Sequence, residues 1–212
     1  TSGGLLQQKS QMLNIPVVPI DFLGEPRSAI GYGLLNLLSI FDKLKFIPRQ
    51  NKFVIEAIKQ LALTDKSWNR EIPTHYNYAK QLAIDIGHNI PIIIGSGLFT
   101  SAAQRWKTQF NEEAKTWAFW ETEPTSYDKL LVHSALLERS IKKIHLLILQ
   151  ARNTPKNSHY RTSTTTTIPQ EELQFKGNTH LEQVLNGISM GDFTSYYLAM
   201  LNNIDPSPVP SL

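Results

Sequence analysis

The sequence predicts an α/β protein with three layers, in which helices cover parallel sheets. Short β-rich runs alternate with helical patterns, and this alternation is typical of parallel strands joined by helices. The clearest run is IPIIIGSG at 90–97, which predicts a buried strand that ends in a Gly-Ser-Gly turn. The chain has 212 residues, which is enough for one large domain or two compact lobes.

Apolar spacing and turn residues give the elements in order. The first half is predicted to contain a strand at 15–20, a buried helix from Pro26 to before Pro48, a helix at 50–63, a polar connection at 64–74 and a helix at 75–87. The second half is predicted to contain a strand at 90–97, a helix at 98–115, a strand at 116–120, a helix at 127–141, a strand at 143–150, an exposed loop at 153–167, a strand at 172–176 and a helix at 180–202.

Composition excludes several classes of protein. Hydrophobic residues make up 41% and charged residues 18%, so the chain is apolar enough to fold, yet its apolar runs are too short to cross a bilayer. The net charge of +3 is spread along the chain, which argues against nucleic-acid binding and is compatible with phosphorylated metabolites. Cysteine is absent, which excludes disulfides and thiolate chemistry and fits a cytoplasmic protein. The six histidines show no metal-binding spacing, so we expect no metal or other cofactor.

The helix at 98–115 carries one candidate site. Arg105, Gln109 and Glu112 are spaced i, i+4, i+7 and therefore share a face. A carboxylate beside Arg and Gln at a crevice could act as a base, with the two neighbours binding substrate. The alternative is an ordinary solvated helix face with a surface pair.

Two glycine turns and one arginine are candidates for binding anions. Gly95 and Ser96 lie between a strand and a helix, where backbone N–H groups and the helix dipole could hold a phosphate. Ser2, Gly3 and Gly4 form a similar turn at the start of the chain. Arg27 follows Pro26 at a helix entry and could pair with an anionic substrate. The alternatives are tight structural turns and an exposed first-turn arginine.

Four segments together resemble the bifunctional phosphoglucose/phosphomannose isomerase family, which has two sugar isomerase (SIS) lobes. They are, in the family's order, TSGG, EPRSAIGYGLL, PIIIGSGLFTSAAQRWKTQFNEEAK and GDFTSYYLAMLNNIDPSPV. The resemblance covers nearly the whole chain but begins late in the family's first lobe. It implies the remainder of a first lobe at 1–63, a connection at 64–87 and a second, nearly complete lobe at 88–212. We therefore expect a chain that is incomplete at its start.

The resemblance implies a reaction and roles for particular residues. Family members interconvert aldose and ketose 6-phosphates through a cis-enediol without a cofactor, and they form homodimers. The family's base falls on Glu112, with Glu113 as a second candidate, and the arginine that stabilises the enediolate falls on Arg27.

The chain departs from the family pattern at three places. Asp128 stands where the ring-opening histidine belongs, and His133 is the nearest substitute. The family's C-terminal lysine has no counterpart, and its phosphate loop would precede Thr1. The missing histidine and lysine favour the alternative of a non-catalytic SIS module that binds a sugar phosphate or only dimerises. A sensor attached to a DNA-binding regulator is disfavoured because no helix-turn-helix is present.

Overall fold

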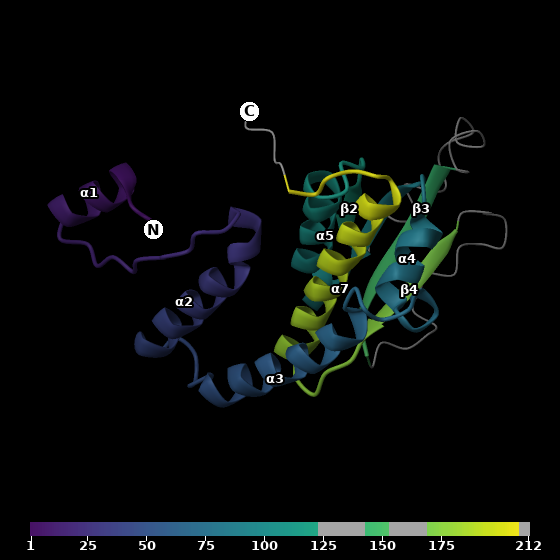
Figure 1. Cartoon of the computed structure of the whole chain (residues 1–212). Coiled ribbons are helices and arrows are strands. Elements are labelled where there is room, and N and C mark those ends of the chain that lie inside the picture. The colour runs from purple at the N-terminus through teal and green to yellow at the C-terminus, as the bar shows by residue number, and fades with distance from the viewer. Residues whose placement is uncertain (123–142, 153–168, 208–212) are drawn as a thin grey trace. The chain divides into compact units, whose positions relative to one another are not determined.

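The computed structural model describes residues 1–122, 143–152 and 169–207 (Figure 1). Contacts divide the chain into an N-terminal unit, Thr1–Lys52, and a C-terminal unit, Phe53–Leu212. The helix predicted at 127–141 and the loop predicted at 153–167 lie outside the described residues. The predicted α/β class with a parallel sheet is confirmed, and the sheet belongs to the C-terminal unit.

The N-terminal unit contains helices but no buried residue. Its elements are α1 (Gly4–Met12), the 3₁₀ turn η1 (Pro26–Ala29) and α2 (Ile30–Lys43). The strand predicted at 15–20 is wrong, because these residues form no strand. Pro16 and Pro19 lack the N–H groups that a sheet ladder needs. The prediction that α2 is buried is also wrong: its apolar side chains remain at least partly exposed, and Leu37 is 54% exposed.

The C-terminal unit is built on a four-stranded parallel sheet. Its strands are β1 (Ile90–Gly95), β2 (Phe119–Thr122), β3 (Ile144–Ala151) and β4 (Gln170–Phe175), in the order β2-β1-β3-β4. Ile93 is opposite Leu147, and Leu149 is opposite Leu173. Side chains alternate between the two faces of a strand, so Ile92 and Ile94 project to the opposite face from Ile93 and are buried there as well.

Helices surround the core of this unit. They are α3 (Asn51–Trp68), which begins just before the unit boundary, the 3₁₀ turn η2 (Thr74–Tyr76), α4 (Tyr78–Ile86), the 3₁₀ turn η3 (Gly97–Phe99), α5 (Thr100–Glu112) and α7 (His180–Leu201). In Figure 1, α4 and α7 lie beside each other in front of the sheet, and both helices contribute to the core. The connection predicted at 64–74 is wrong over its first part, because α3 continues to Trp68.

Helix ends in this unit follow local capping chemistry. The Asn77 side chain accepts a hydrogen bond from Lys80 N–H and caps α4. The Thr179 hydroxyl accepts from Glu182 N–H at the start of α7, and the Glu182 carboxylate accepts in return from the Asn178 N–H at 2.7 Å. This reciprocal pattern resembles a capping box and fixes where the long α7 begins.

Helices α5 and α7 approach each other closely around Trp106. The indole N–H of Trp106 donates to the Gly187 carbonyl at 2.7 Å, and the residue is fully buried. A Cβ on Gly191 would lie 2.4 Å from the Trp106 indole nitrogen, so only glycine fits there. The two helices are thus held in one arrangement, and this arrangement positions the polar groups described next.

Candidate functional site

Two carboxylates lie where α5 ends. Glu112 is the last residue of the helix and is half-buried, and its carboxylate makes no hydrogen bond or ion pair with the described residues. Glu113 is held instead: its Oε2 lies 2.6 Å from the Ser195 hydroxyl, and its Oε1 accepts from the Gln109 amide at 3.3 Å. The two neighbouring carboxylates therefore differ. The Glu113 carboxylate is hydrogen-bonded to Ser195 of α7, whereas the Glu112 carboxylate has no such contact with the described residues and is available to a substrate.

Asp192 of α7 joins two of the predicted substrate-binding residues. Arg105 Nη2 lies 3.0 Å from Asp192 Oδ2 in an ion pair, and the Gln109 amide donates to Oδ1 at 2.9 Å. Gln109 is only 2% exposed. Burial raises the pKa of the Asp192 carboxyl, and the positive charge and hydrogen bond of Arg105 oppose that rise.

These contacts form a polar network across the α5–α7 interface, made of Arg105, Gln109, Glu113, Asp192 and Ser195. The sequence placed Glu112 on a face with Arg105 and Gln109. The structure puts Glu113 in contact with Gln109 instead. The two residues are four positions apart, and Glu113 keeps a helical backbone at the end of α5, where its N–H donates to the Gln109 carbonyl at 2.8 Å. The network fixes the end of α5 and thereby the backbone of Glu112. Substrate binding by Arg105 and Gln109 stays a prediction.

The Gly-Ser-Gly turn lies at the carboxyl end of β1, as the sequence predicts. A Cβ on Gly95 would lie 2.3 Å from the Phe99 carbonyl oxygen and 2.8 Å from the Ala103 Cβ, so close packing requires glycine. The Ser96 carbonyl accepts from Phe99 N–H at 2.9 Å, and its hydroxyl caps no helix. Packing thus explains Gly95, and phosphate binding at Gly95 and Ser96 stays a prediction.

The remaining predicted residues belong to other parts of the chain. Gly3 has φ 127° and Gly4 has φ 69°, backbone conformations that favour glycine, and Ser2 beside them is exposed. Arg27 lies in η1 of the N-terminal unit and is half-buried. His133 lies outside the described residues. Since Arg27 and Glu112 belong to different units, their meeting at one site stays a prediction.

Two kinds of feature are absent from the described residues. Among residues 1–122, 143–152 and 169–207, no three His, Cys, Asp or Glu side chains are grouped closely enough to hold a metal ion. No helix in these same ranges has both the length and the apolar character to cross a bilayer.

Residues 75–212 match the family described as bacterial phospho-glucose isomerase C-terminal SIS domain. The chain belongs to this family. The family resemblance seen in the sequence motifs is thereby confirmed, and the matched range contains β1, α5, α7 and the whole α5–α7 network.

Curated relatives extend the SIS likeness over the full chain. A bifunctional phosphoglucose/phosphomannose isomerase of Thermoplasma volcanium is 32% identical over 216 residues, which cover 99% of this chain and 64% of the relative. A protein of the same description from Caldicellulosiruptor bescii is 27% identical over 219 residues, which cover 100% of this chain and 65% of the relative. The chain thus spans about two thirds of the length of these relatives.

Solved structures show the same fold. A glucose-6-phosphate isomerase like protein from Thermus thermophilus has a TM-score of 0.65 and 21% identity, covering 75% of this chain and 55% of that one. Glucosamine-6-phosphate deaminase from Thermotoga maritima has a TM-score of 0.59 and 12% identity, covering 94% of this chain and 60% of that one. At these identities the likeness establishes the SIS-type fold alone.

Sequence reasoning missed two members of the polar network in this SIS domain. Asp192 and Ser195 lie one turn apart on a helix that the sequence predicted well, but no role was assigned to them. One signal was present: Asp192 is the only acidic residue in the second half of an apolar helix. Acidic residues are seldom buried without a partner. The position of Asp192 on an apolar helix therefore indicates that a cation lies opposite it on a neighbouring element.

Proposed function

We propose that this chain belongs to an aldose–ketose isomerase that interconverts glucose 6-phosphate or mannose 6-phosphate with fructose 6-phosphate. The proposal is supported by membership of the SIS family, by the names of the curated relatives and by the geometry at the end of α5. The observation that carries it is the contrast between Glu112 and Glu113. Only Glu112 has a carboxylate that is not held by the described residues, on a backbone that the α5–α7 network fixes.

In the proposed reaction Glu112 acts as the base. Its carboxylate removes the proton from C2 of the open-chain aldose, and the C–H electrons form the C1–C2 double bond as the C1=O π bond opens onto O1, which takes up a proton to give the cis-enediol. The O2 hydroxyl then loses a proton as the C2=O bond forms, and the proton held by Glu112 is returned to C1 to give the ketose. The Arg27 guanidinium would stabilise the negative charge of the enediolate. His133 would assist ring opening.

The proposed binding site for the sugar phosphate consists of the two glycine turns together with Arg105 and Gln109 of α5. Backbone N–H groups at Gly95 and Ser96, at the carboxyl end of β1, and at Ser2, Gly3 and Gly4 are the candidates for holding the phosphate. We also infer that the protein works as a homodimer in the cytoplasm, on the basis of the family resemblance and the absence of cysteine.

A second candidate function is a non-catalytic SIS module that binds a sugar phosphate. It is favoured by one observation: Arg105 and Gln109 are already paired with Asp192, so their polar groups serve the α5–α7 interface. Under this proposal the protein binds fructose 6-phosphate without converting it.

One experiment separates the two candidates. Fructose 6-phosphate is incubated with the protein, and the formation of glucose 6-phosphate or mannose 6-phosphate is followed by proton NMR. We expect turnover in the unchanged protein and a loss of roughly 100-fold or more in Glu112→Gln, the range of a lost general base.

The matched control is Glu113→Gln, which removes the neighbouring carboxylate and should reduce turnover far less than Glu112→Gln. Full activity in Glu112→Gln would show that this carboxylate is not the base. No turnover in the unchanged protein, together with a thermal shift on adding fructose 6-phosphate, would favour the binding module.

A further inference from the structure

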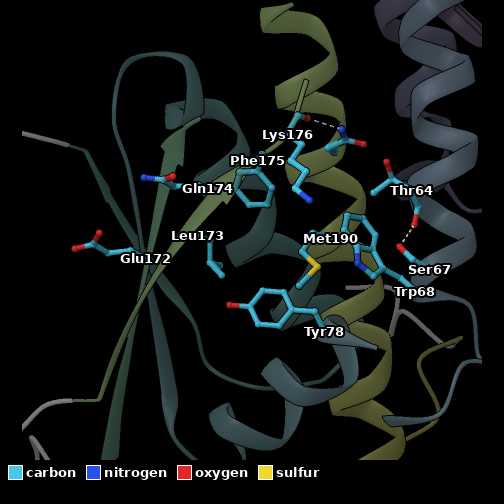
Figure 2. A pocket seen from close by; sticks show the side chains of 11 residues that line it. Thr64, Ser67, Trp68, Tyr78, Glu172, Leu173, Gln174, Phe175, Lys176 and Met190 are labelled. Carbon is cyan, nitrogen blue, oxygen red and sulfur yellow. Dashed lines mark hydrogen bonds between the residues drawn. The ribbon is translucent and has the colours of Figure 1, made fainter. Parts of the chain in front are cut away.

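A pocket of about 440 Å³ lies beside β4, within the C-terminal unit (Figure 2). Its walls come from the end of α3, from Tyr78 of α4, from β4 with the residue that follows it, and from the first half of α7. The volume falls in the range of about 300–1,000 Å³ that is usual for small-molecule sites. None of the residues predicted to take part in catalysis or substrate binding lines this pocket, so it is separate from the site proposed above.

The pocket has an apolar side. Figure 2 shows Trp68, Phe175 and Met190 turned toward the same space, whereas Glu172 and Gln174 point away from it. Phe175 and Met190 are 6% and 1% exposed and belong to the core, and Trp68 packs against that core. The apolar wall is therefore part of a rigid framework, and it offers a flat aromatic surface to a ligand.

Among the described residues that line the pocket, Lys176 is the one cation. In Figure 2 the Lys176 side chain extends toward the space between Phe175 and Met190. Its ammonium group makes no hydrogen bond or ion pair with any residue that the structure describes. Since Glu172 points away, the charge inside the pocket is positive, and an anionic group is the complementary partner.

Hydrogen-bond acceptors cover the remaining wall. The Thr64 hydroxyl donates to the Gln60 carbonyl at 2.9 Å, and the Ser67 hydroxyl donates to the Thr64 carbonyl at 2.6 Å. Each hydroxyl has used its proton and keeps lone pairs that can accept. Asn186 is 5% exposed; its amide donates to the Lys176 carbonyl at 2.7 Å, and its buried Oδ1 has no donor within the described part of the chain. A ligand that brings hydroxyl donors would suit this wall.

We propose that this pocket binds a phosphorylated sugar at a second, non-catalytic site. Lys176 contacts the phosphate, the hydroxyl oxygens of Thr64 and Ser67 accept from the sugar hydroxyls, and Trp68 lies against the C–H face of the ring. A neutral sugar lacks the charge that Lys176 requires, and an aromatic acid lacks the hydroxyl donors. The site does not depend on Glu112 being a catalytic base.

Tryptophan NMR tests this proposal directly. The chain has four tryptophans, so the ¹⁵N-labelled protein gives a small set of indole signals, and Trp68→Phe identifies the one from Trp68. Glucose 6-phosphate should shift the Trp68 signal in a saturable manner. Glucose alone and inorganic phosphate alone should each bind at least tenfold more weakly. Glucose cannot pair with Lys176, and inorganic phosphate cannot pack against Trp68.

Two lysine variants test whether the charge inside the pocket is the one that matters. Lys176→Gln should weaken binding of glucose 6-phosphate at Trp68 roughly tenfold, the loss of one charge-assisted contact. Lys66→Gln removes the same charge from an exposed position on α3 outside the pocket and should change the affinity less than about twofold.

Three outcomes would overturn the proposal. The first is a Trp68 signal that does not move with glucose 6-phosphate, and the second is equal binding by the two lysine variants. The third is loss of the Trp68 shift in Glu112→Gln, which would mean that the signal reports the proposed catalytic site. Turnover in Glu112→Gln tests the isomerase proposal separately, so the failure of either proposal can be told from the failure of the other.

Discussion

The N-terminal and C-terminal units use similar helical sequences with opposite results. Leu37 of α2 and Leu82 of α4 both occupy apolar positions of a predicted helix, yet Leu37 is 54% exposed and Leu82 is fully buried. The C-terminal unit has a sheet against which its helices pack, whereas residues 1–52 contain no strand. The comparison teaches that apolar spacing predicts a helix and its inner face, while burial depends on a second surface from elsewhere in the chain.

The largest contrast between the units is expected for the two leucines. Leu82→Ala should lower the free energy of unfolding by about 2–5 kcal/mol, because it leaves a cavity in the core, and Leu37→Ala by no more than about 0.5 kcal/mol. Urea unfolding followed by tryptophan fluorescence measures the first effect, since all four tryptophans belong to the C-terminal unit. Circular dichroism follows the helices of both units. Equal losses in the two variants would contradict the contrast.

Substitutions at two glycines, one in each unit, should change the stability by an intermediate amount and in opposite directions. A Cβ at Gly95 would lie 2.3 Å from a backbone oxygen, whereas a Cβ at Gly33 of α2 would meet nothing within 4 Å. Gly95→Ala should therefore destabilise the protein by roughly 1–3 kcal/mol. Gly33→Ala should stabilise α2 by about 0.5–1 kcal/mol, because alanine loses less entropy in a helix. Thermal unfolding followed by circular dichroism measures whether each variant is more or less stable than the unchanged protein. A Gly95→Ala protein as stable as the unchanged one would rule out the tight turn.

The smallest effect is expected at Asp192, where burial in the C-terminal unit raises the carboxyl pKa above its ordinary value of 3.8. The folded protein then binds the proton more tightly than the unfolded chain does. The stability that this group contributes is greatest at low pH and declines as pH rises from about 4 through the folded pKa.

Asp192→Asn cannot titrate, so the stability of the unchanged protein should fall relative to this variant as pH rises, by roughly 1 kcal/mol or less. Urea unfolding at several pH values measures the difference. The control is the same comparison in an Asp65→Asn background, which keeps the titration of Asp65 itself out of the difference. Asp65→Asn removes a like charge that raises the pKa of Asp192, so the decline should be smaller in that background. A relative stability that increases with pH would contradict the assignment.

Much of the C-terminal unit could be predicted because its signals are local. The apolar run at 90–97 became β1, and the helix predicted at 180–202 is α7, which begins at a capping pattern of Thr179 and Glu182. The strand predicted at 15–20 failed because a strand exists only when a neighbour completes its ladder, and no pattern within the segment reveals that neighbour.

The candidate site could be predicted only in part. The sequence placed Glu112, Arg105 and Gln109 on one helix, and the family resemblance gave Glu112 its role. The hydrogen bonds that Asp192 and Ser195 make with α5 and Glu113 could not be predicted. These two residues lie more than 80 positions from their partners in the chain and meet them only because α7 packs against α5. The pocket of Figure 2 could not be predicted from the sequence for the same reason, because its walls come from four separate elements.

The sequence by itself determined the family and most helices and strands of the C-terminal unit, because capping, apolar periodicity and motif order are properties of neighbouring residues. Only the tertiary structure decided which carboxylate at the end of α5 is held and which is available. It also decided that Lys176 and Trp68 line the same pocket. Those outcomes depend on how helices pack on a sheet, and that packing joins residues which the sequence keeps far apart.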